Sequence, residues 1–460
     1  MKRKRTYQAG PVEQVRVDEL LPLLVAGCIV ALDVAKQRFV VALATLAGEV
    51  VKLFRFDHPT ETRKFLSVVT ALRAGVETGK LKAAMEPTGT YGDAVRHQLV
   101  AEGVPVCMVS PKRTHDSQEL FDGVRSLHDP KSAVLVAKLC AMGLAAEWNP
   151  PPSTRTGLRA LVELRQHEQR RGEVCFGRLE AVLSRHWPEL GEWMDVREQK
   201  SALRMLATYP SPARVRAEPE MVRSFLREAS RARLSAATVE GVVAGTQATL
   251  GVPMMAEEER LVSTLATHAL EARERADGLD HDMLELARNN AVFARLQPWM
   301  GTYTAAVIIT LCDPLQYAKA RQLEKACGLN LREKSSGEYH GRLSITKRGP
   351  GLVRQLLYLF ALRMLQESSA VRAWYVRRRG YTEESKRRAV VAVMRKLVRA
   401  LFHVARGAAF DASKLFDLRR LDLEAPSAMA AKKVTSRTTP RAYARGPKRT
   451  RGGTSMRAST

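Results

Sequence analysis

The sequence lacks the features that mark secreted and membrane proteins. Its 460 residues include only six cysteines, and no two of them form a Cys-x-x-Cys pair. This scarcity argues against a zinc knuckle or a disulfide framework and agrees with a reducing cytosol. No apolar run approaches the roughly 20 residues that a membrane-spanning helix needs. The basic start at residues 2–5 is not directly followed by the apolar core of a signal peptide. We therefore expect a cytoplasmic protein that does not enter a membrane.

Acidic residues are scarce relative to basic ones. Lys and Arg number 74 against 48 Asp and Glu, which leaves a formal net charge of +26. Each phosphate that such a chain neutralises releases condensed counterions, so this balance predicts a nucleic-acid partner. On charge alone, the alternative is a basic soluble protein such as a ribosome-associated factor. Residues 432–460 contain nine basic residues and no acidic one, which predicts a disordered tail that binds phosphates non-specifically.

The first third of the chain has the pattern of an α/β domain. Short apolar segments at 28–32, 39–43 and 50–54 predict a β-meander, with the apolar stretch from Leu20 leading into its first strand. The expected elements that follow are a helix at 60–72, a strand at 82–85, a helix at 91–102 and a strand at 104–109. This alternation predicts an α/β sheet with functional residues at the strand ends.

The remainder of the chain has mainly helical patterns. After three prolines at 150–152, leucine and valine recur at helical spacing in a charged background, which predicts long helices or a coiled coil. The segment 202–286 is typical of a solvated helical spacer or an oligomerisation arm. The expected regions are a basic N-terminal extension at 1–26, an α/β domain at 27–150, a helical or coiled-coil region at 151–290, a mainly helical domain at 291–415 and a basic disordered tail at 416–460.

Three acidic residues stand at the ends of expected elements. Asp33 ends the strand at 29–32, Glu86 ends the strand at 82–85, and Asp129 begins a helix. Carboxylates that converge from separate elements suit a hard cation such as Mg²⁺. Two such ions would activate an attacking oxygen and stabilise the leaving oxygen in phosphodiester cleavage. Taken singly, Asp129 is also explained as a helix N-cap and Glu86 as a turn residue.

Ser336 is a second candidate for chemistry, because it lies in a Gly- and Ser-containing segment rich in positive charge. The flanking basic residues are Arg332, Lys334, Arg342, Lys347 and Arg348. A loop of this kind can bring a hydroxyl to a phosphate, although a serine needs deprotonation or a polarised phosphate to attack. The alternative for this segment is an ordinary basic loop that contacts DNA.

These segments resemble the DEDD-type transposases of the Piv/MooV invertase group of insertion sequences. Asp33 lies in Ala-Leu-Asp-Val-Ala-Lys, Glu86 in Met-Glu-Pro-Thr-Gly-Thr-Tyr-Gly, and Asp129 in Leu-His-Asp-Pro-Lys-Ser-Ala, so the resemblance covers about residues 27–145. The motif Ser-Ser-Gly-Glu-Tyr-His-Gly-Arg extends it to the C-terminal part. The family's serine nucleophile precedes the glycine, which points to Ser336, with Ser335 as the adjacent alternative.

The resemblance implies both a fold and an activity. The first domain would have a RuvC-like, ribonuclease H-type fold with Mg²⁺ at Asp33, Glu86 and Asp129, and the C-terminal domain would carry the serine. The expected partners are donor DNA, target DNA and a non-coding guide RNA. The expected assembly is a homodimer or homotetramer with a composite site shared between protomers, acting at the nucleoid of a bacterial cytoplasm. A RuvC-like metal-dependent nuclease would use the same acids and leave Ser336 idle.

One position departs from the family pattern. The family's fourth acid stands three residues after the third, where this chain has Ser132. A spacing of three puts Asp129 and Ser132 on one helix face, so Ser132 would lie beside the metal without a charged ligand. Three explanations stay open: a weakened metal site, substitution by another acid such as Asp122 or Asp116, or an inactive nucleic-acid-binding homologue.

Overall fold

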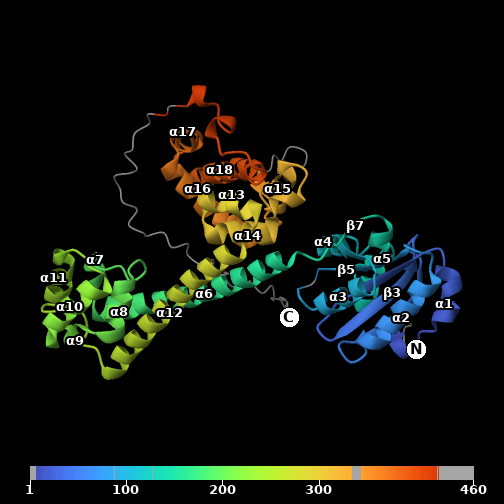
Figure 1. Cartoon of the computed structure of the whole chain (residues 1–460), viewed down its shortest axis with the longest axis horizontal. Helices are drawn as coiled ribbons and strands as arrows, with labels where there is room; N and C mark the ends of the chain where they lie inside the picture. The colour runs from blue at the N-terminus through green and yellow to red at the C-terminus, as the bar shows by residue number, and fades with distance from the viewer. Residues whose placement is uncertain (1–6, 88, 127, 334–342, 422, 424–460) are drawn as a thin grey trace, which may run out of the picture. The chain divides into compact units, whose positions relative to one another are not determined.

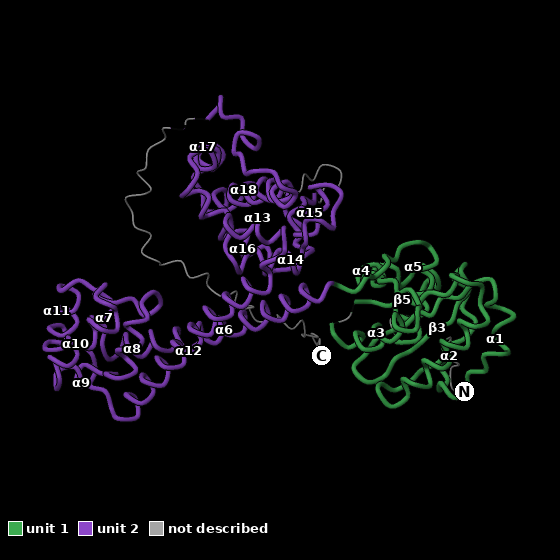
Figure 2. Tube along the Cα trace, viewed as in Figure 1, with its two compact units in different colours: residues 1–151 green, residues 152–460 purple. Residues whose placement is uncertain are grey.

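The computed structural model describes residues 7–87, 89–126, 128–333, 343–421 and 423. The chain divides into two compact units, Met1–Pro151 and Pro152–Thr460 (Figures 1 and 2). Most of the expected basic tail lies outside the described residues, as do Lys334, Ser335, Ser336 and Arg342.

Unit 1 is built on a seven-stranded mixed sheet. Its strands are β1 (Gly10–Pro11), β2 (Cys28–Asp33), β3 (Arg38–Thr45), β4 (Val50–Asp57), β5 (Leu81–Met85), β6 (Val106–Val109) and β7 (Ala145–Glu147). They lie in the order β1-β4-β3-β2-β5-β6-β7. β2, β3 and β4 form the expected antiparallel meander, whereas β5 returns parallel to β2 through the crossover helix α2 (Thr62–Gly75). The expected α/β class is thus confirmed.

Helices cover both faces of this sheet. The remaining helices of unit 1 are η1 (Val12–Gln14), α1 (Val17–Leu24), α3 (Asp93–Ala101), α4 (Pro111–Asp116) and α5 (Asp129–Ala141). Alternation along β2 sends Val30 and Leu32 into the core shared with α1, α2 and α3, and sends Ile29 and Ala31 into the core under α5. The apolar stretch from Leu20 does lead into the core strand β2, but its first residues, as far as Leu24, belong to the helix α1, which the sequence did not predict.

Unit 2 begins with two long helices that pack along each other. These are α6 (Ser153–His186) and α12 (Ala256–Leu286). They run antiparallel, since Arg165 pairs with Asp280 at 3.1 Å and Arg171, further along α6, pairs with Glu271 at 3.1 Å. Figure 1 shows the pair as one arm of unit 2.

Five short helices between α6 and α12 form a bundle at one end of this arm, here called the arm bundle. They are α7 (Leu190–Trp193), α8 (Lys200–Thr208), α9 (Pro212–Ala217), α10 (Pro219–Ala229) and α11 (Ala236–Gly245). The arm bundle has a core of its own, in which Trp187, Leu203 and Leu226 are almost completely buried. A folded subdomain with a core therefore stands where the sequence suggested a solvated spacer.

The rest of unit 2 is a second helical core. Its elements are α13 (Ala291–Met300), α14 (Thr302–Cys312), η2 (Pro314–Gln316), α15 (Ala320–Ala326), β8 (Leu331–Arg332), β9 (Ser344–Ile345), α16 (Gly351–Glu367), α17 (Ser369–Arg378), α18 (Glu383–Val404), η3 (Ala412–Lys414) and η4 (Leu418–Arg420). α14 is apolar almost all round and lies at the centre of this core. Within the described ranges, none of the helices is both long and apolar enough to span a bilayer.

Candidate active site

Asp33 and Glu86 are neighbours at one edge of the sheet of unit 1. β2 and β5 are adjacent parallel strands, and their register pairs Leu32 with Met85. The next residue in each segment is an acid, Asp33 at the end of β2 and Glu86 directly after β5. The two acids therefore follow paired residues at the carboxyl ends of parallel strands, which is where α/β proteins place their sites.

Asp129 comes to the same edge from α5. This helix packs over β2 and β3, and Asp129 is its first residue. The N-cap is the preceding residue His128, whose ring nitrogen accepts the Lys131 backbone N–H at 3.4 Å. The explanation of Asp129 as the N-cap is therefore wrong. Its exposed carboxylate lies at a helix N-terminus, where the helix dipole favours negative charge.

The charges of Asp129 and Glu86 act on Asp33. The pKa of Asp33 is raised from 3.8 to about 7, chiefly because burial penalises its charged form and further because the carboxylates of Asp129 and Glu86 repel it. A carboxylate that stays partly protonated at neutral pH is costly to keep, and such perturbed groups cluster at functional sites. The structure thus brings together three acids, of which the first and the last are 96 residues apart in the sequence.

The chemistry of this edge fits a divalent cation, although ligand geometry is not formed. Carboxylate oxygens are the ligands that Mg²⁺ prefers, and a cation would relieve the repulsion at Asp33. In the part of the chain that the structure describes, no three His, Cys, Asp or Glu side chains are grouped tightly enough to hold a metal ion. The three acids interact through their charges, at longer range than the ligands of one ion.

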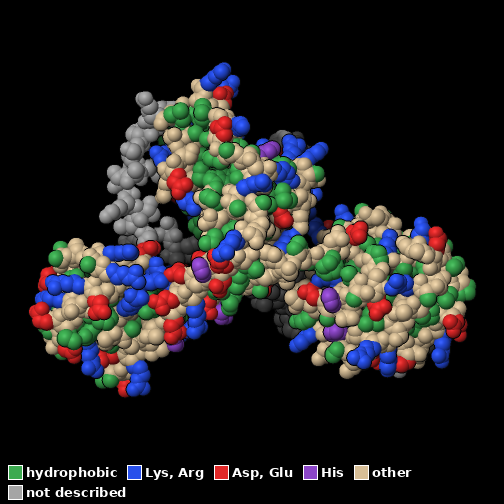
Figure 3. Space-filling model, viewed as in Figure 1, with side chains coloured by type: hydrophobic (Ala, Val, Ile, Leu, Met, Phe, Trp, Pro, Cys, Tyr) green, Lys and Arg blue, Asp and Glu red, His purple; other side chains and the backbone are tan. Residues whose placement is uncertain are grey.

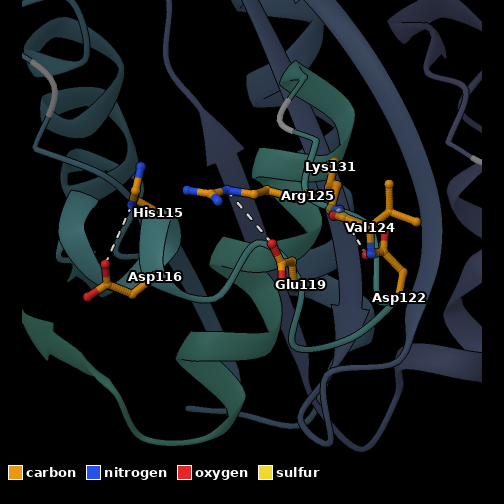
Figure 4. A network of polar contacts seen from close by, with 7 residues as sticks. All are labelled: His115, Asp116, Glu119, Asp122, Val124, Arg125 and Lys131. Atoms are coloured by element: carbon orange, nitrogen blue, oxygen red, sulfur yellow. Dashed lines mark hydrogen bonds and ion pairs between the residues drawn. The ribbon is translucent and has the colours of Figure 1, made fainter.

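The acids considered as substitutes for the missing fourth carboxylate are occupied elsewhere. Asp122 accepts a hydrogen bond from the buried ammonium of Lys131 at 2.8 Å, and this ion pair lowers the pKa of Asp122 (Figure 4). Asp116 pairs with Lys112 and lies near His115. Ser132, one turn after Asp129 on α5, is buried. The fourth position therefore offers a hydroxyl and no charge.

Arg38 is a residue near this edge that the sequence did not single out. It begins β3 and pairs with Asp57 at 2.8 Å. The pKa of Arg38 is raised mainly by this bond, and the negative charge of Asp129 adds to the effect. A single arginine before an apolar strand forms no motif, so only the fold shows that a guanidinium lies within electrostatic reach of Asp129.

The described part of the basic segment in unit 2 is anchored to the end of α15. Arg332 of β8 pairs with Ser344 of β9, which brackets the segment that contains Ser336. Lys347 has a left-handed backbone (φ 55°) and its N–H donates to the Gly328 carbonyl at 3.0 Å. Arg332, Lys347 and Arg348 are exposed, as expected for residues that contact phosphate. Their nucleic-acid contacts stay a prediction, as do those of Lys334 and Arg342.

Known protein families match both candidate regions of the chain. Residues 30–188, with all three acids, match the DEDD transposase family model of IS110, described as "Transposase". Residues 297–376, with Ser336, match the model described as "Transposase IS116/IS110/IS902 family". The two segments cover just over half of the chain. A stretch of 93 residues is 29% identical to the pilin gene-inverting protein of Moraxella bovis, and this match covers 20% of the chain and 29% of that relative's length.

Proposed function

Because the chain belongs to the IS110-type family of transposases, we propose that it is a DNA recombinase that cuts and rejoins donor and target DNA. The observation that carries this proposal is the convergence of Asp33, Glu86 and Asp129, seen in the raised pKa of Asp33. A buried carboxylate at a strand edge whose pKa is raised by burial and by two nearby acids suits phosphoryl transfer with bound cations. The net charge of +26 supports a polyanionic substrate.

In this proposal Asp33, Glu86 and Asp129 hold divalent metal, with Mg²⁺ as the expected ion. The bound metal would polarise the phosphate and stabilise the leaving oxygen. Asp33 is partly protonated near neutral pH, so its protonated fraction must release the proton before it serves as a ligand. Arg38 contributes positive charge near Asp129, which favours the approach of a phosphate over a neutral ligand.

The proposed nucleophile is the Ser336 hydroxyl, which lies outside the described residues. Its oxygen bonds to a DNA phosphorus while one deoxyribose oxygen leaves and takes up a proton, so that a phosphoserine ester forms. A deoxyribose hydroxyl of the other DNA then attacks this ester, which joins the strands and restores the serine. Arg332, Lys347 and Arg348 are exposed beside this segment in sequence and would counter the phosphate charge.

Several finer features belong to the same proposal. The sheet of unit 1 would be a RuvC-like, ribonuclease H-type fold, and unit 2 would comprise a helical arm and a serine-bearing transposase domain. A non-coding guide RNA would pair with donor and target DNA, while the protein would hold its backbone through Lys and Arg. The protein would act as a homodimer or homotetramer at the bacterial nucleoid.

Metal dependence tests the proposed activity. Purified protein, supplied with the RNA transcribed beside its gene, should recombine donor and target plasmids in Mg²⁺ and should stop when a chelator is added. The physical reason is that carboxylates repel a phosphate, so a metal ion bound between them is needed to polarise it. Recombination is measured by amplification across the new junctions. Full activity in chelator would contradict the metal role, and binding without any junctions in Mg²⁺ would favour the inactive homologue.

Ser132 gives a second test of the acidic site. We expect Ser132→Asp to lower the Mg²⁺ concentration for half-maximal recombination by about tenfold, because it restores a charged ligand one turn after Asp129. Ser132→Asn is the matched control, since it has the same size without the charge and should produce no such gain. An equal gain with Asn, or no gain with Asp at unchanged thermal stability, would exclude a metal-binding role for this position.

A further inference from the structure

A hollow lined by basic side chains lies on the arm bundle and contains none of the candidate site residues. It has a volume of about 540 Å³ and lies between α8, the loop from α10 to α11, and α12. Five of its lining residues are basic, namely Lys200, Arg204, Arg231, Arg233 and Arg273. Figure 3 shows groups of Lys and Arg side chains on the surface of this bundle, with acidic side chains between them. One acid, Glu198, also lines the hollow, and no aromatic residue does.

The basic residues of this hollow are only partly neutralised. Lys200 pairs with Asp277 at 2.6 Å, and Arg204 pairs with Glu274 at 3.2 Å. Among the described residues, Arg231, Arg233 and Arg273 have no ion pair with a carboxylate. Arg273 donates instead to the backbone carbonyl of Arg197 at 2.9 Å.

Several other arginines of the arm bundle pair with acids. Arg197 contacts Glu173 at 2.8 Å and Glu180 at 2.5 Å, and Arg223 contacts Glu240 at 3.0 Å. The segment 187–255 is nearly balanced in charge overall, yet Arg231 and Arg233, which pair with no carboxylate among the described residues, line one hollow together with Arg273. Clustered like charges repel one another, and an anion bound among them would remove this repulsion.

The loop that carries two of these arginines has an unusual backbone. Arg231 and Ala232 adopt left-handed conformations, with φ 53° and φ 57°, which residues other than glycine rarely adopt. The turn is nevertheless well tied, since the N–H groups of Arg231 and Ala232 donate to the carbonyls of Glu228 and Arg227, both at 2.8 Å. Glycine is the residue that suits such a helix end, so an arginine at position 231 lowers the stability of the fold relative to glycine.

We propose that this hollow binds phosphate groups of a nucleic-acid backbone and so gives the arm bundle a nucleic-acid contact of its own. The proposal rests on the proposed function, which supplies DNA and RNA as partners. The guanidinium groups of Arg231, Arg233 and Arg273 would each bind phosphate oxygens, for which their planar fork is well suited. No aromatic side chain lines the hollow to stack on a base. The contact would therefore bind the sugar-phosphate backbone of the nucleic acid without specificity for its base sequence.

The left-handed loop provides variants that separate binding from folding. Arg231→Gly removes one charge and relieves the backbone strain, whereas Ala232→Gly relieves the neighbouring strain without changing the charge. Both should raise the thermal midpoint by about 2 °C. Arg233→Ala removes a second charge, and Arg260→Ala is the matched charge control, since Arg260 is exposed on α12 outside the hollow.

Binding of the full-length variants is measured by fluorescence anisotropy over a salt series, with a labelled duplex of about 30 base pairs and a labelled stem-loop RNA as separate probes. Arg231→Gly and Arg233→Ala should each weaken binding by roughly five- to tenfold and reduce the salt slope by about 1 for at least one probe. Ala232→Gly should keep wild-type binding. The probe that loses affinity identifies DNA or RNA as the source of the phosphates.

The proposal is overturned if Arg231→Gly and Arg233→Ala bind both probes like the wild type, or if Arg260→Ala loses as much affinity as they do. Failure of the recombinase assignment would look different. An inactive wild-type protein in the plasmid assay would contradict the recombinase, whereas loss of affinity in the two arginine variants would still support the hollow as a phosphate site.

Discussion

Replacing Asp33 by asparagine should abolish recombination and, above pH 7, make unit 1 more stable than the wild type. The pKa of Asp33 is about 7 in the folded protein against 3.8 as an ordinary value. Between these values the folded state binds more protons, so the free energy of unfolding falls as the pH rises from 4 to 7. Above pH 7 this loss of unfolding free energy is complete, and below pH 4 there is no loss. Asparagine has no charge to penalise, so the variant escapes this loss.

The size of the effect follows from the pKa difference. At 1.36 kcal/mol per unit the shift sets an upper limit of about 4 kcal/mol, and water at the sheet edge should reduce the gain to on the order of 2 kcal/mol. Thermal melting from pH 4 to pH 8.5 measures it. Asp18→Asn is the matched control, because Asp18 is an exposed acid of the same unit in α1. It should leave both activity and the pH profile unchanged.

Mg²⁺ should make the wild type more stable than Asp33→Asn above pH 7, which is the reverse of their order without Mg²⁺. A cation that binds the folded state raises its stability, so Mg²⁺ above pH 7 should raise the melting temperature of the wild type and leave Asp33→Asn unaffected. Equal shifts in both proteins would place the bound cation elsewhere. An Asp33→Asn variant that is less stable than the wild type at pH 8 would contradict the crowding of three carboxylates at this edge.

Replacing Ser336 by alanine should remove the covalent protein–DNA adduct and reduce recombination by about 10³-fold or more, because the hydroxyl is the proposed nucleophile. The adduct is measured as labelled DNA that stays with the protein through denaturing electrophoresis. The variant should keep wild-type affinity for DNA, since the neighbouring basic residues are unchanged.

The adjacent serine provides the matched control for this experiment. Ser335→Ala should keep the adduct and most of the activity, and the opposite pattern would assign the nucleophile to Ser335. If the adduct persists in both single variants and in the double variant, neither serine is the nucleophile. Free 5′-phosphate ends without any adduct in the wild type would favour a RuvC-like nuclease that attacks with metal-activated water.

The ion pair of the buried Lys131 with the partly exposed Asp122 shows that some charged residues next to the candidate site serve the fold and not the chemistry. Lys131 lies on α5 between Asp129 and Ser132, yet its ammonium turns to Asp122 and to the Val124 carbonyl at 2.6 Å (Figure 4). A buried ammonium requires such partners, because leaving it unpaired costs several kcal/mol. Asp122 therefore has a structural role that competes with metal binding.

Local sequence patterns predicted strands β2 to β6 and the acids at the ends of β2 and β5, but not the short edge strands β1 and β7. Alternating apolar residues and turn residues specify the meander of β2, β3 and β4, and an acid directly after an apolar run marks a strand end. Each of these signals spans only a few residues, so the sequence reveals it without knowledge of the tertiary structure. The helix α1 was missed because its apolar residues continue toward β2 without a clear break.

The tertiary structure alone decided how the separated elements meet. The parallel register of β2 and β5 puts Asp33 beside Glu86, and the packing of α5 brings the charge of Asp129 to them. The core of the arm bundle and the basic hollow on it likewise join residues from α8, α10 and α12. Burial and charge repulsion depend on neighbours that are distant in the sequence. A local sequence pattern gives no information about how close such residues lie in space.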